Sequence, residues 1–92
     1  MRGEPITGQR FWIVGASSGI GAALANELVG RGARVAISAR RADALERVAD
    51  DGMTVVPLDV CDRQAVRQAA ADVTDALGGI DVVVSCAAYW QK

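Results

Sequence analysis

The sequence contains no histidine, one lysine, one tyrosine and two cysteines among its 92 residues. Without histidine, the chain has no histidine-based catalytic triad, no imidazole general base and no histidine metal site. Cys61 and Cys86 are not spaced like metal ligands, so we expect reduced thiols, as in a cytoplasmic protein, and no bound metal. These absences exclude much of metal and nucleophile chemistry before any motif is considered.

The sequence also lacks a charge excess and a long apolar run. Its 10 basic and 11 acidic residues give a net charge of −1, which provides no electrostatic basis for binding nucleic acid or an anionic membrane. No apolar run approaches the roughly 20 residues that span a bilayer. With 51% hydrophobic residues, the chain is predicted to form a single small domain over residues 1–92.

Short apolar runs alternate along the chain with segments of helical periodicity. The runs predict strands over 11–14, 35–39, 53–58 and 80–87. Apolar residues at helical spacing predict helices over 19–31, 42–50 and 63–77, and Asp62 is placed to cap the last of them.

Near-continuous apolar strands are typical of a parallel sheet that is covered on both faces. Because crossover connections are right-handed, we expect a Rossmann-type α/β fold of three layers with strand order 3-2-1-4. The first two helices are expected on one face and the third on the other. The fourth strand would be an edge, and its apolar run Val82-Val83-Val84 predicts self-association there.

A glycine-rich stretch, Gly15-Ala-Ser-Ser-Gly19-Ile-Gly21, joins the first predicted strand to the first predicted helix. We expect Gly15 to take the tight turn, Gly19 to let a diphosphate approach the backbone, and Gly21 to let the helix pack closely on the sheet. The free N–H groups and partial positive charge of a helix N-terminus suit a phosphate. The stretch therefore predicts a dinucleotide site, the alternative being a glycine turn that binds nothing.

This stretch resembles the cofactor motif of the short-chain dehydrogenase/reductase family. Three later segments agree in order, namely Ser-Ala-Arg-Arg at 38–41, Leu-Asp-Val at 58–60 and the segment 80–88. Two departures are Val14, where the family commonly has threonine, and Ser-Cys-Ala-Ala at 85–88, where it has Asn-Asn-Ala-Gly. The resemblance runs from about residue 9 and implies the NAD(P)-binding portion of an oxidoreductase.

The resemblance also implies which dinucleotide is bound. Family members that use NAD carry an acid at the end of the second strand, where this chain has Ala39, followed by Arg40 and Arg41. Because an arginine fork matches a phosphate, we expect NADP(H) in preference to NAD(H). The alternative is that both arginines are solvated residues that open the second helix.

The adenine ring is expected to contact the end of the third strand. The resemblance implies that the Asp59 carboxylate accepts the adenine amino group and that the Val60 N–H bonds the same ring. Asp59 could otherwise help to start the third helix, and Asp81 is expected to be a surface charge. The full expected set of cofactor contacts is Gly15, Ser17, Ser18, Gly19, Ile20, Gly21, Arg40, Arg41, Asp59, Val60 and Ala87.

Catalysis in the resembled family uses a serine and a Tyr-x-x-x-Lys pair, in which the lysine lowers the pKa of the tyrosine. The only tyrosine and lysine here, Tyr89 and Lys92, are three residues apart and directly follow the fourth predicted strand. We therefore predict no catalytic residue and expect the sequence to stop before the catalytic half. Three hypotheses remain: the NADP-binding segment of a longer oxidoreductase, a stand-alone non-catalytic binding module, or an inactive fragment.

Overall fold

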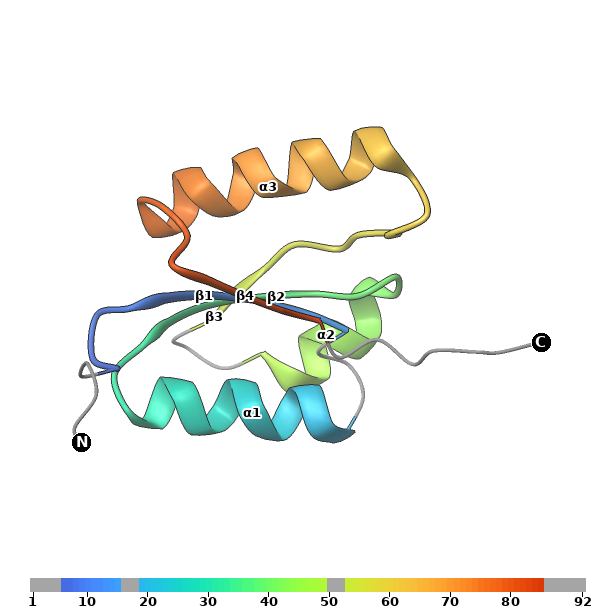
Figure 1. The fold of residues 1–92 in the computed structure, drawn as a ribbon. Helices are drawn as coiled ribbons and strands as arrows, with labels where there is room; N and C mark the ends of the chain where they lie inside the picture. The colour runs from blue at the N-terminus through green and yellow to red at the C-terminus, as the bar shows by residue number, and fades with distance from the viewer. Residues whose placement is uncertain (1–5, 16–18, 50–52, 86–92) are drawn as a thin grey trace.

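The computed structural model describes residues 6–15, 19–49 and 53–85, and within them four strands alternate with three helices (Figure 1). The alternation confirms the order predicted from the apolar periodicity. The strands are β1 (Arg10–Val14), β2 (Arg34–Ser38), β3 (Met53–Val55) and β4 (Val82–Ser85). The helices are α1 (Gly19–Gly30), α2 (Ala42–Val48) and α3 (Arg63–Leu77).

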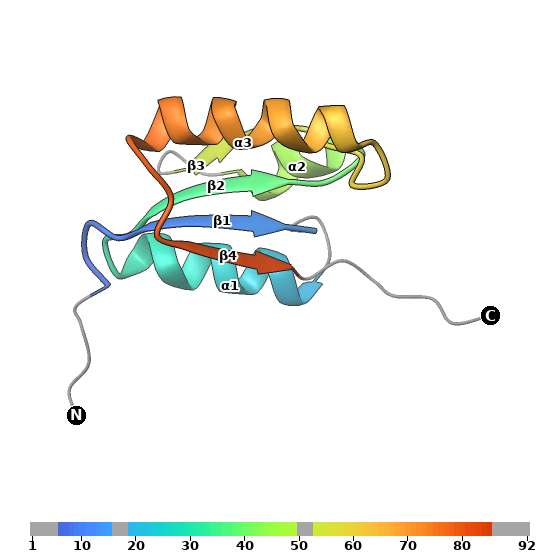
Figure 2. The ribbon, with the colours of Figure 1, turned by 45° about the horizontal axis from the view of Figure 1, so that its top comes forward.

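The strands form one parallel sheet in the order β3-β2-β1-β4, as predicted. In the register of the sheet, Val14 at the end of β1 is paired with Ser38 at the end of β2 and with Ser85 at the end of β4. The carboxyl ends of the strands therefore meet at one edge, and in Figure 2 the arrows of β1, β2 and β4 point the same way.

Helices cover both faces of the sheet, with α1 and α2 on one side and α3 on the other (Figure 1). Successive residues of β1 point to opposite faces, as strand geometry requires. Phe11 and Ile13 belong to the core on the α1 side, whereas Trp12 and Val14 pack with α3. The three-layer α/β architecture predicted from the sequence is thus confirmed.

Several elements end earlier than predicted, for reasons that lie in the backbone. Helix α2 stops at Val48 because Ala49 adopts an extended conformation. Strand β3 was expected to reach Leu58. The N–H groups of Val56 and Leu58 do continue the hydrogen bonding to β2 and the residue after it, and Pro57 is tolerated between them because β3 is an edge strand and its nitrogen faces away from β2. The predicted extension of β4 to residue 87 lies outside the described residues.

The ends of α3 are closed by its own sequence. Oδ1 of Asp62 accepts hydrogen bonds from the N–H groups of Gln64 and Ala65 at 3.0 and 3.1 Å, which confirms the predicted N-cap. At the other end Gly78 has a φ of 84° and donates its N–H to the Thr74 carbonyl, a left-handed cap that favours glycine. These caps fix where the chain enters and leaves the face that α3 covers.

Candidate functional site at the carboxyl edge of the sheet

The glycine-rich stretch leaves β1 through a turn that requires glycine. Gly15 has a φ of 87°, and its N–H donates to the carbonyl of Ser38 on the neighbouring strand at 2.6 Å. This confirms the turn predicted at Gly15. Residues 16–18, which include the predicted contacts Ser17 and Ser18, lie outside the described residues.

The first turn of α1 presents bare backbone and an apolar side chain to the surface. Gly19 is exposed, and a Cβ added there would meet no other atom within 4 Å. Ile20 is 79% exposed, whereas Gly21 is buried with Ala25 and Leu28. Gly21 therefore lies where close helix packing was expected, and the surface at Gly19 has room for a ligand.

The two arginines after β2 differ in their surroundings. Arg41 precedes α2 and lies 3.5 Å from the Asp43 carboxylate in an ion pair whose side chains are 77% and 61% exposed. Arg40 is also exposed, and it makes no ion pair or hydrogen bond within the described part of the chain. Arg40 is therefore freer than Arg41 to bind an anionic ligand at this edge. Arg41, which is exposed and precedes α2, partly matches the alternative interpretation of a solvated residue that opens the helix.

Asp59 serves local structure with only one of its two carboxylate oxygens. Oδ1 accepts the N–H of Cys61 at 3.0 Å, and the Asp59 carbonyl accepts the N–H of Asp62 at 3.0 Å. Both bonds build the turn that leads into α3, as the alternative interpretation of Asp59 required. Oδ2 has no hydrogen-bond partner among the residues that the structure describes, and the neighbouring Val60 is 49% exposed.

Parallel pairing brings these three loops to the same edge of the sheet, at the right of Figure 1. The sequence predicted this gathering because each loop follows the carboxyl end of a strand. Among the predicted contacts, Ala87 lies outside the described residues along with the two serines. Those that the structure describes at this edge are Gly15, Gly19, Ile20, Gly21, Arg40, Arg41, Asp59 and Val60.

Sequence reasoning missed one polar contact directly behind these loops. Ser38, which is fully buried, accepts a hydrogen bond through Oγ from the indole Nε1 of Trp12 at 2.8 Å. A serine inside the otherwise apolar run at 35–39 was the available signal, since a buried hydroxyl needs a partner. The sequence did not identify the partner, because Trp12 lies in an apolar run where a buried core residue is expected.

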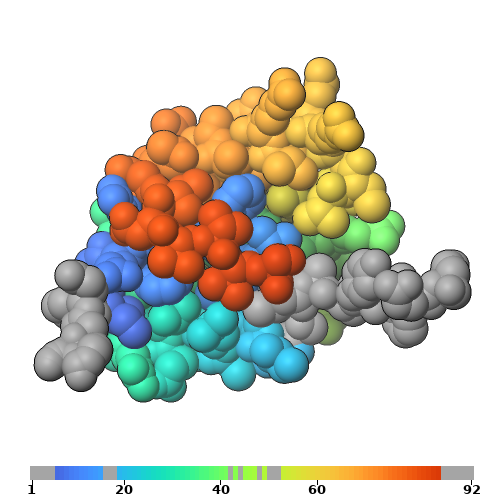
Figure 3. All heavy atoms as spheres, viewed as in Figure 1, coloured from blue at the N-terminus to red at the C-terminus, as the bar shows by residue number. Residues whose placement is uncertain are grey.

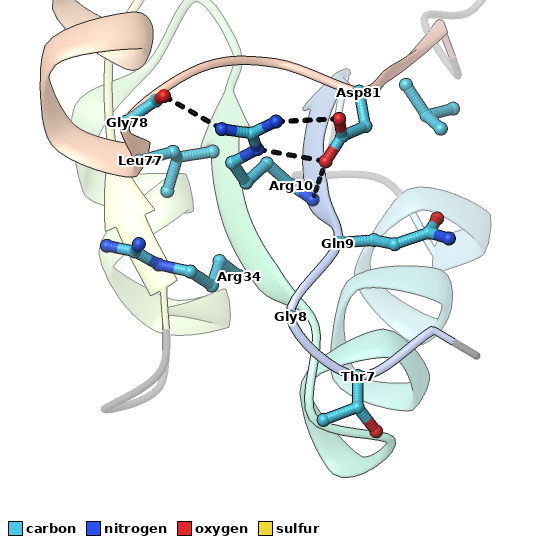
Figure 4. A pocket seen from close by; sticks show the side chains of 9 residues that line it. Thr7, Gly8, Gln9, Arg10, Arg34, Leu77, Gly78 and Asp81 are labelled. Atoms are coloured by element: carbon cyan, nitrogen blue, oxygen red, sulfur yellow. Dashed lines mark hydrogen bonds and ion pairs between the residues drawn. The ribbon is translucent and has the colours of Figure 1, made fainter. Parts of the chain in front are cut away.

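The opposite edge of the sheet holds an ion pair between Arg10 and Asp81, which is exposed and precedes β4 as the predicted surface charge (Figure 4). The sequence did not predict its partner: Asp81 receives two parallel hydrogen bonds from Arg10, Nε to Oδ2 at 2.9 Å and Nη2 to Oδ1 at 2.8 Å. The Arg10 N–H also donates to Oδ2, and Nη1 donates to the Gly78 carbonyl at 2.8 Å. The pairing of β1 with β4 brings together these residues, which are 71 positions apart.

The fork lowers the pKa of Asp81 from its ordinary value of 3.8 to about 2, chiefly through the side-chain hydrogen bonds from Arg10 and then through the backbone N–H of Arg10. The same hydrogen bonds raise the pKa of Arg10. Gly79 lies against the guanidinium, and a Cβ there would come within 2.5 Å of Nη1. At the amino edge, the charged groups of Arg10 and Asp81 are therefore already bound, to each other and to the Gly78 carbonyl, and this contact stabilises the fold.

The described residues provide no other site of obvious chemistry. Among them no group of three or more histidine, cysteine, aspartate or glutamate residues is placed to hold a metal ion. Cys61 is an exposed free thiol in the turn before α3. No helix in the described ranges is both long enough and apolar enough to cross a membrane.

Comparison with known proteins agrees with this geometry. The family model described as short chain dehydrogenase matches residues 9–92. A glycine betaine reductase of Emericella nidulans is 44% identical over 89 residues, a match that covers 90% of this chain and 7% of that protein.

Two solved structures share the fold closely. A short-chain type dehydrogenase/reductase from Mycobacterium marinum is 38% identical with a TM-score of 0.81, covering 85% of this chain and 34% of the other. A 3-ketoacyl-(acyl-carrier-protein) reductase from Brucella melitensis, complexed with NADH, is 30% identical with a TM-score of 0.81, covering 85% and 33%. The chain thus spans about a third or less of the length of these relatives. On its sequence and its fold, the chain belongs to the short-chain dehydrogenase/reductase family of oxidoreductases.

Proposed function

We propose that this chain binds a nicotinamide dinucleotide at the carboxyl edge of its sheet, with the diphosphate at the N-terminus of α1. The observation that carries the proposal is the turn at Gly15, with its φ of 87°, followed by an exposed Gly19 with no atom near its missing Cβ. The first N–H groups of a helix have no partner inside the helix, and the helix dipole favours an anion there. A diphosphate satisfies both requirements.

Family membership supports the same ligand. The related Brucella reductase was solved with NADH. In our proposal the adenosine lies toward β2 and β3, where Oδ2 of Asp59 and the exposed Val60 are available. Ser17, Ser18 and Ala87 remain proposed contacts outside the described residues.

We propose further that NADP(H) is preferred to NAD(H). Arg40 supports this preference, because it is exposed, lies two residues past the end of β2 and has no competing carboxylate bound to it within the described chain. A charge-assisted hydrogen bond contributes about 1.5–3 kcal/mol, which corresponds to a roughly 10- to 150-fold difference in affinity.

Calorimetric titration with NADPH and NADH tests both proposals. We expect saturable binding of both, with NADPH tighter, and Arg40→Ala should weaken NADPH about 10- to 150-fold while leaving NADH within about twofold. Arg47→Ala is the matched control, because Arg47 is an exposed arginine within α2 that follows no strand. Equal affinity of the unmodified chain for NADPH and NADH would contradict the proposed role of Arg40. Absence of binding of either dinucleotide would contradict the proposed function.

The proposal is restricted to binding, since the 92 residues hold no Tyr-x-x-x-Lys pair. In a polypeptide that supplies this pair, the bound dinucleotide would exchange a hydride with a carbonyl or alcohol substrate. The exposed Cys61 thiol fits the cytoplasmic location that the composition predicts, because thiols persist in a reducing compartment.

We also propose that copies of the chain associate through the outer edge of β4. In Figure 3, β4 (the red end of the described chain) lies at the surface between α3 and α1, and Val83 is 57% exposed. An uncovered apolar edge strand is a template for pairing with another chain. Sedimentation velocity should show oligomers that Val83→Lys disperses and that Ala71→Lys, an exposed control on α3, does not. A monomer at all concentrations contradicts this.

A further inference from the structure

We propose that Ser38 is a positioning residue for the dinucleotide site and that its hydrogen bond with Trp12 is the means by which it acts. The inference rests on the proposed function, because the site it positions is the one described above. Ser38 lies behind the loops that form the site, so it acts through them instead of touching the ligand.

Ser38 makes one hydrogen bond with a side chain of β1 and another with the turn that follows β1. The backbone carbonyl of Ser38 accepts the N–H of Gly15 at 2.6 Å, which fixes the turn that leads to the diphosphate position. Its side-chain Oγ accepts the indole N–H of Trp12 at 2.8 Å. Ser38 is fully buried and Trp12 is 5% exposed, so neither group can exchange its partner freely for water.

The chain that follows Ser38 connects this contact to the other two loops. Ala39 is buried, and its carbonyl accepts the N–H of Leu58 at 2.8 Å. Arg40 comes directly after Ala39, and Asp59 comes directly after Leu58. The glycine turn, the proposed phosphate-binding arginine and the proposed adenine acceptor are therefore all within two residues of this set of hydrogen bonds.

Trp12 also packs against residues that lead into the glycine turn and the Asp59 segment. Its indole belongs to the core under α3, in a cluster that also contains Val14 and Leu58. Val14 immediately precedes the turn at Gly15. Removing the Ser38 hydroxyl would leave the indole N–H without an acceptor in an apolar setting, so the ring must shift or admit water. Either response moves the residues from which the glycine turn and the Asp59 segment begin.

The test compares Ser38→Ala with Val73→Ala, a control that truncates a fully buried residue of α3 in the same core cluster. Urea unfolding measures stability, and calorimetry measures NADPH and NADH affinity under conditions where circular dichroism shows each variant folded. We expect Ser38→Ala to weaken both dinucleotides about tenfold, equivalent to about 1.4 kcal/mol. Val73→Ala should lose stability and keep its affinity within about twofold.

Rescue and a second variant separate positioning from general damage. Ser38→Thr retains the hydroxyl and should bind within about twofold of the unmodified chain. If its extra methyl prevents folding, Trp12→Phe replaces it as the test, because this change removes the N–H donor and keeps an aromatic ring. Trp12→Phe should weaken binding, and adding Ser38→Ala to it should cause less than a further twofold loss.

Three results would overturn the proposal. The first is unchanged affinity in Ser38→Ala, and the second is equal weakening in Val73→Ala at the same loss of stability. The third is an unmodified chain that binds neither dinucleotide, which refutes the proposed function as well. Because the third is read on the unmodified chain before any variant is made, the two failures are distinguishable.

Discussion

The two edges of the sheet use their polar groups in opposite ways. At the amino edge, Arg10, Asp81 and the Gly78 carbonyl bind one another through short hydrogen bonds. At the carboxyl edge, Gly19 presents open backbone and Arg40 lies exposed without a bound carboxylate among the described residues. The charged groups of the amino edge are thus hydrogen-bonded within the protein, whereas the carboxyl edge leaves the Arg40 guanidinium available to a ligand.

A hollow in the surface of this protein is not by itself a ligand site. The amino edge has such a hollow, lined by residues that include Thr7, Arg10, Arg34 and Asp81 (Figure 4). Its two arginines already donate to carbonyls at the C-terminal end of α3, Arg34 to Ala76 in the last turn and Arg10 to the capping residue Gly78. Cations at a helix C-terminus complement its dipole, so this edge is built for stability.

The largest effect that the comparison predicts is at the carboxyl edge. Gly19→Leu should abolish measurable dinucleotide binding, a loss of at least about 100-fold or about 2.8 kcal/mol, because its side chain occupies the space proposed for the diphosphate. Folding should be retained, since the added atoms meet no others near the Cβ and Gly19 has no positive φ. Calorimetry and circular dichroism measure the two properties.

Gly30→Leu is the matched control for this change. Gly30 is the last residue of the same helix, is exposed, and also has nothing within 4 Å of an added Cβ. We expect binding within about twofold of the unmodified chain. If Gly19→Leu and Gly30→Leu bind alike, the N-terminus of α1 is not the diphosphate site and the contrast between the edges fails.

At the amino edge, Asp81→Asn should lower stability without affecting affinity. Because folding lowers the pKa of Asp81 from 3.8 to about 2, the ionised carboxylate contributes stability that is full above about pH 4 and is lost as the pH falls toward 2. Urea midpoints between pH 7 and pH 2 should therefore fall in the unmodified chain, and Asp81→Asn should start lower and remove this component.

Asp75→Asn, at an exposed position on α3, serves as the control and should leave the acid dependence unchanged. If the urea midpoints of Asp81→Asn and the unmodified chain are equal throughout this pH range, the ion pair of Arg10 and Asp81 is not a stabilising contact. A change in dinucleotide affinity would contradict the separation of the two edges.

The smallest effects are expected at Asp59 and Asp62, where one substitution should lower affinity and the other should lower stability. Asp62→Ala removes the cap of α3 and should lower stability by about 1 kcal/mol, with binding unchanged. Asp59→Asn keeps an oxygen for the Cys61 N–H but loses the carboxylate, so affinity should fall several-fold while stability changes little. Urea unfolding and calorimetry on both variants provide the comparison, and the reversed pattern would refute the adenine assignment.

Sequence periodicity predicted the fold because its signals are local. The apolar runs, the Asp62 cap and the glycine at position 15 each depend on a few neighbouring residues, and each was confirmed. The loops of the candidate site were predictable as a group, since parallel strands bring their carboxyl ends together. Their roles in binding stay predictions. The fork between Arg10 and Asp81 was missed because its partners are far apart in the chain, although Arg10 starts β1 and Asp81 directly precedes its predicted neighbour β4.

The alternation of strands and helices, the strand order and the edge at which the three loops gather could all be read from the sequence, because they follow from hydrophobic periodicity and right-handed crossovers. The long-range contacts between polar groups could not be read in this way and are known only from the folded chain. The hydrogen bond between Ser38 and Trp12 and the ion pair between Arg10 and Asp81 both depend on the register between strands and on side-chain directions. The reason is that a hydrogen bond requires two atoms within about 3 Å, and these partners are 26 and 71 positions apart, so only folding brings them together.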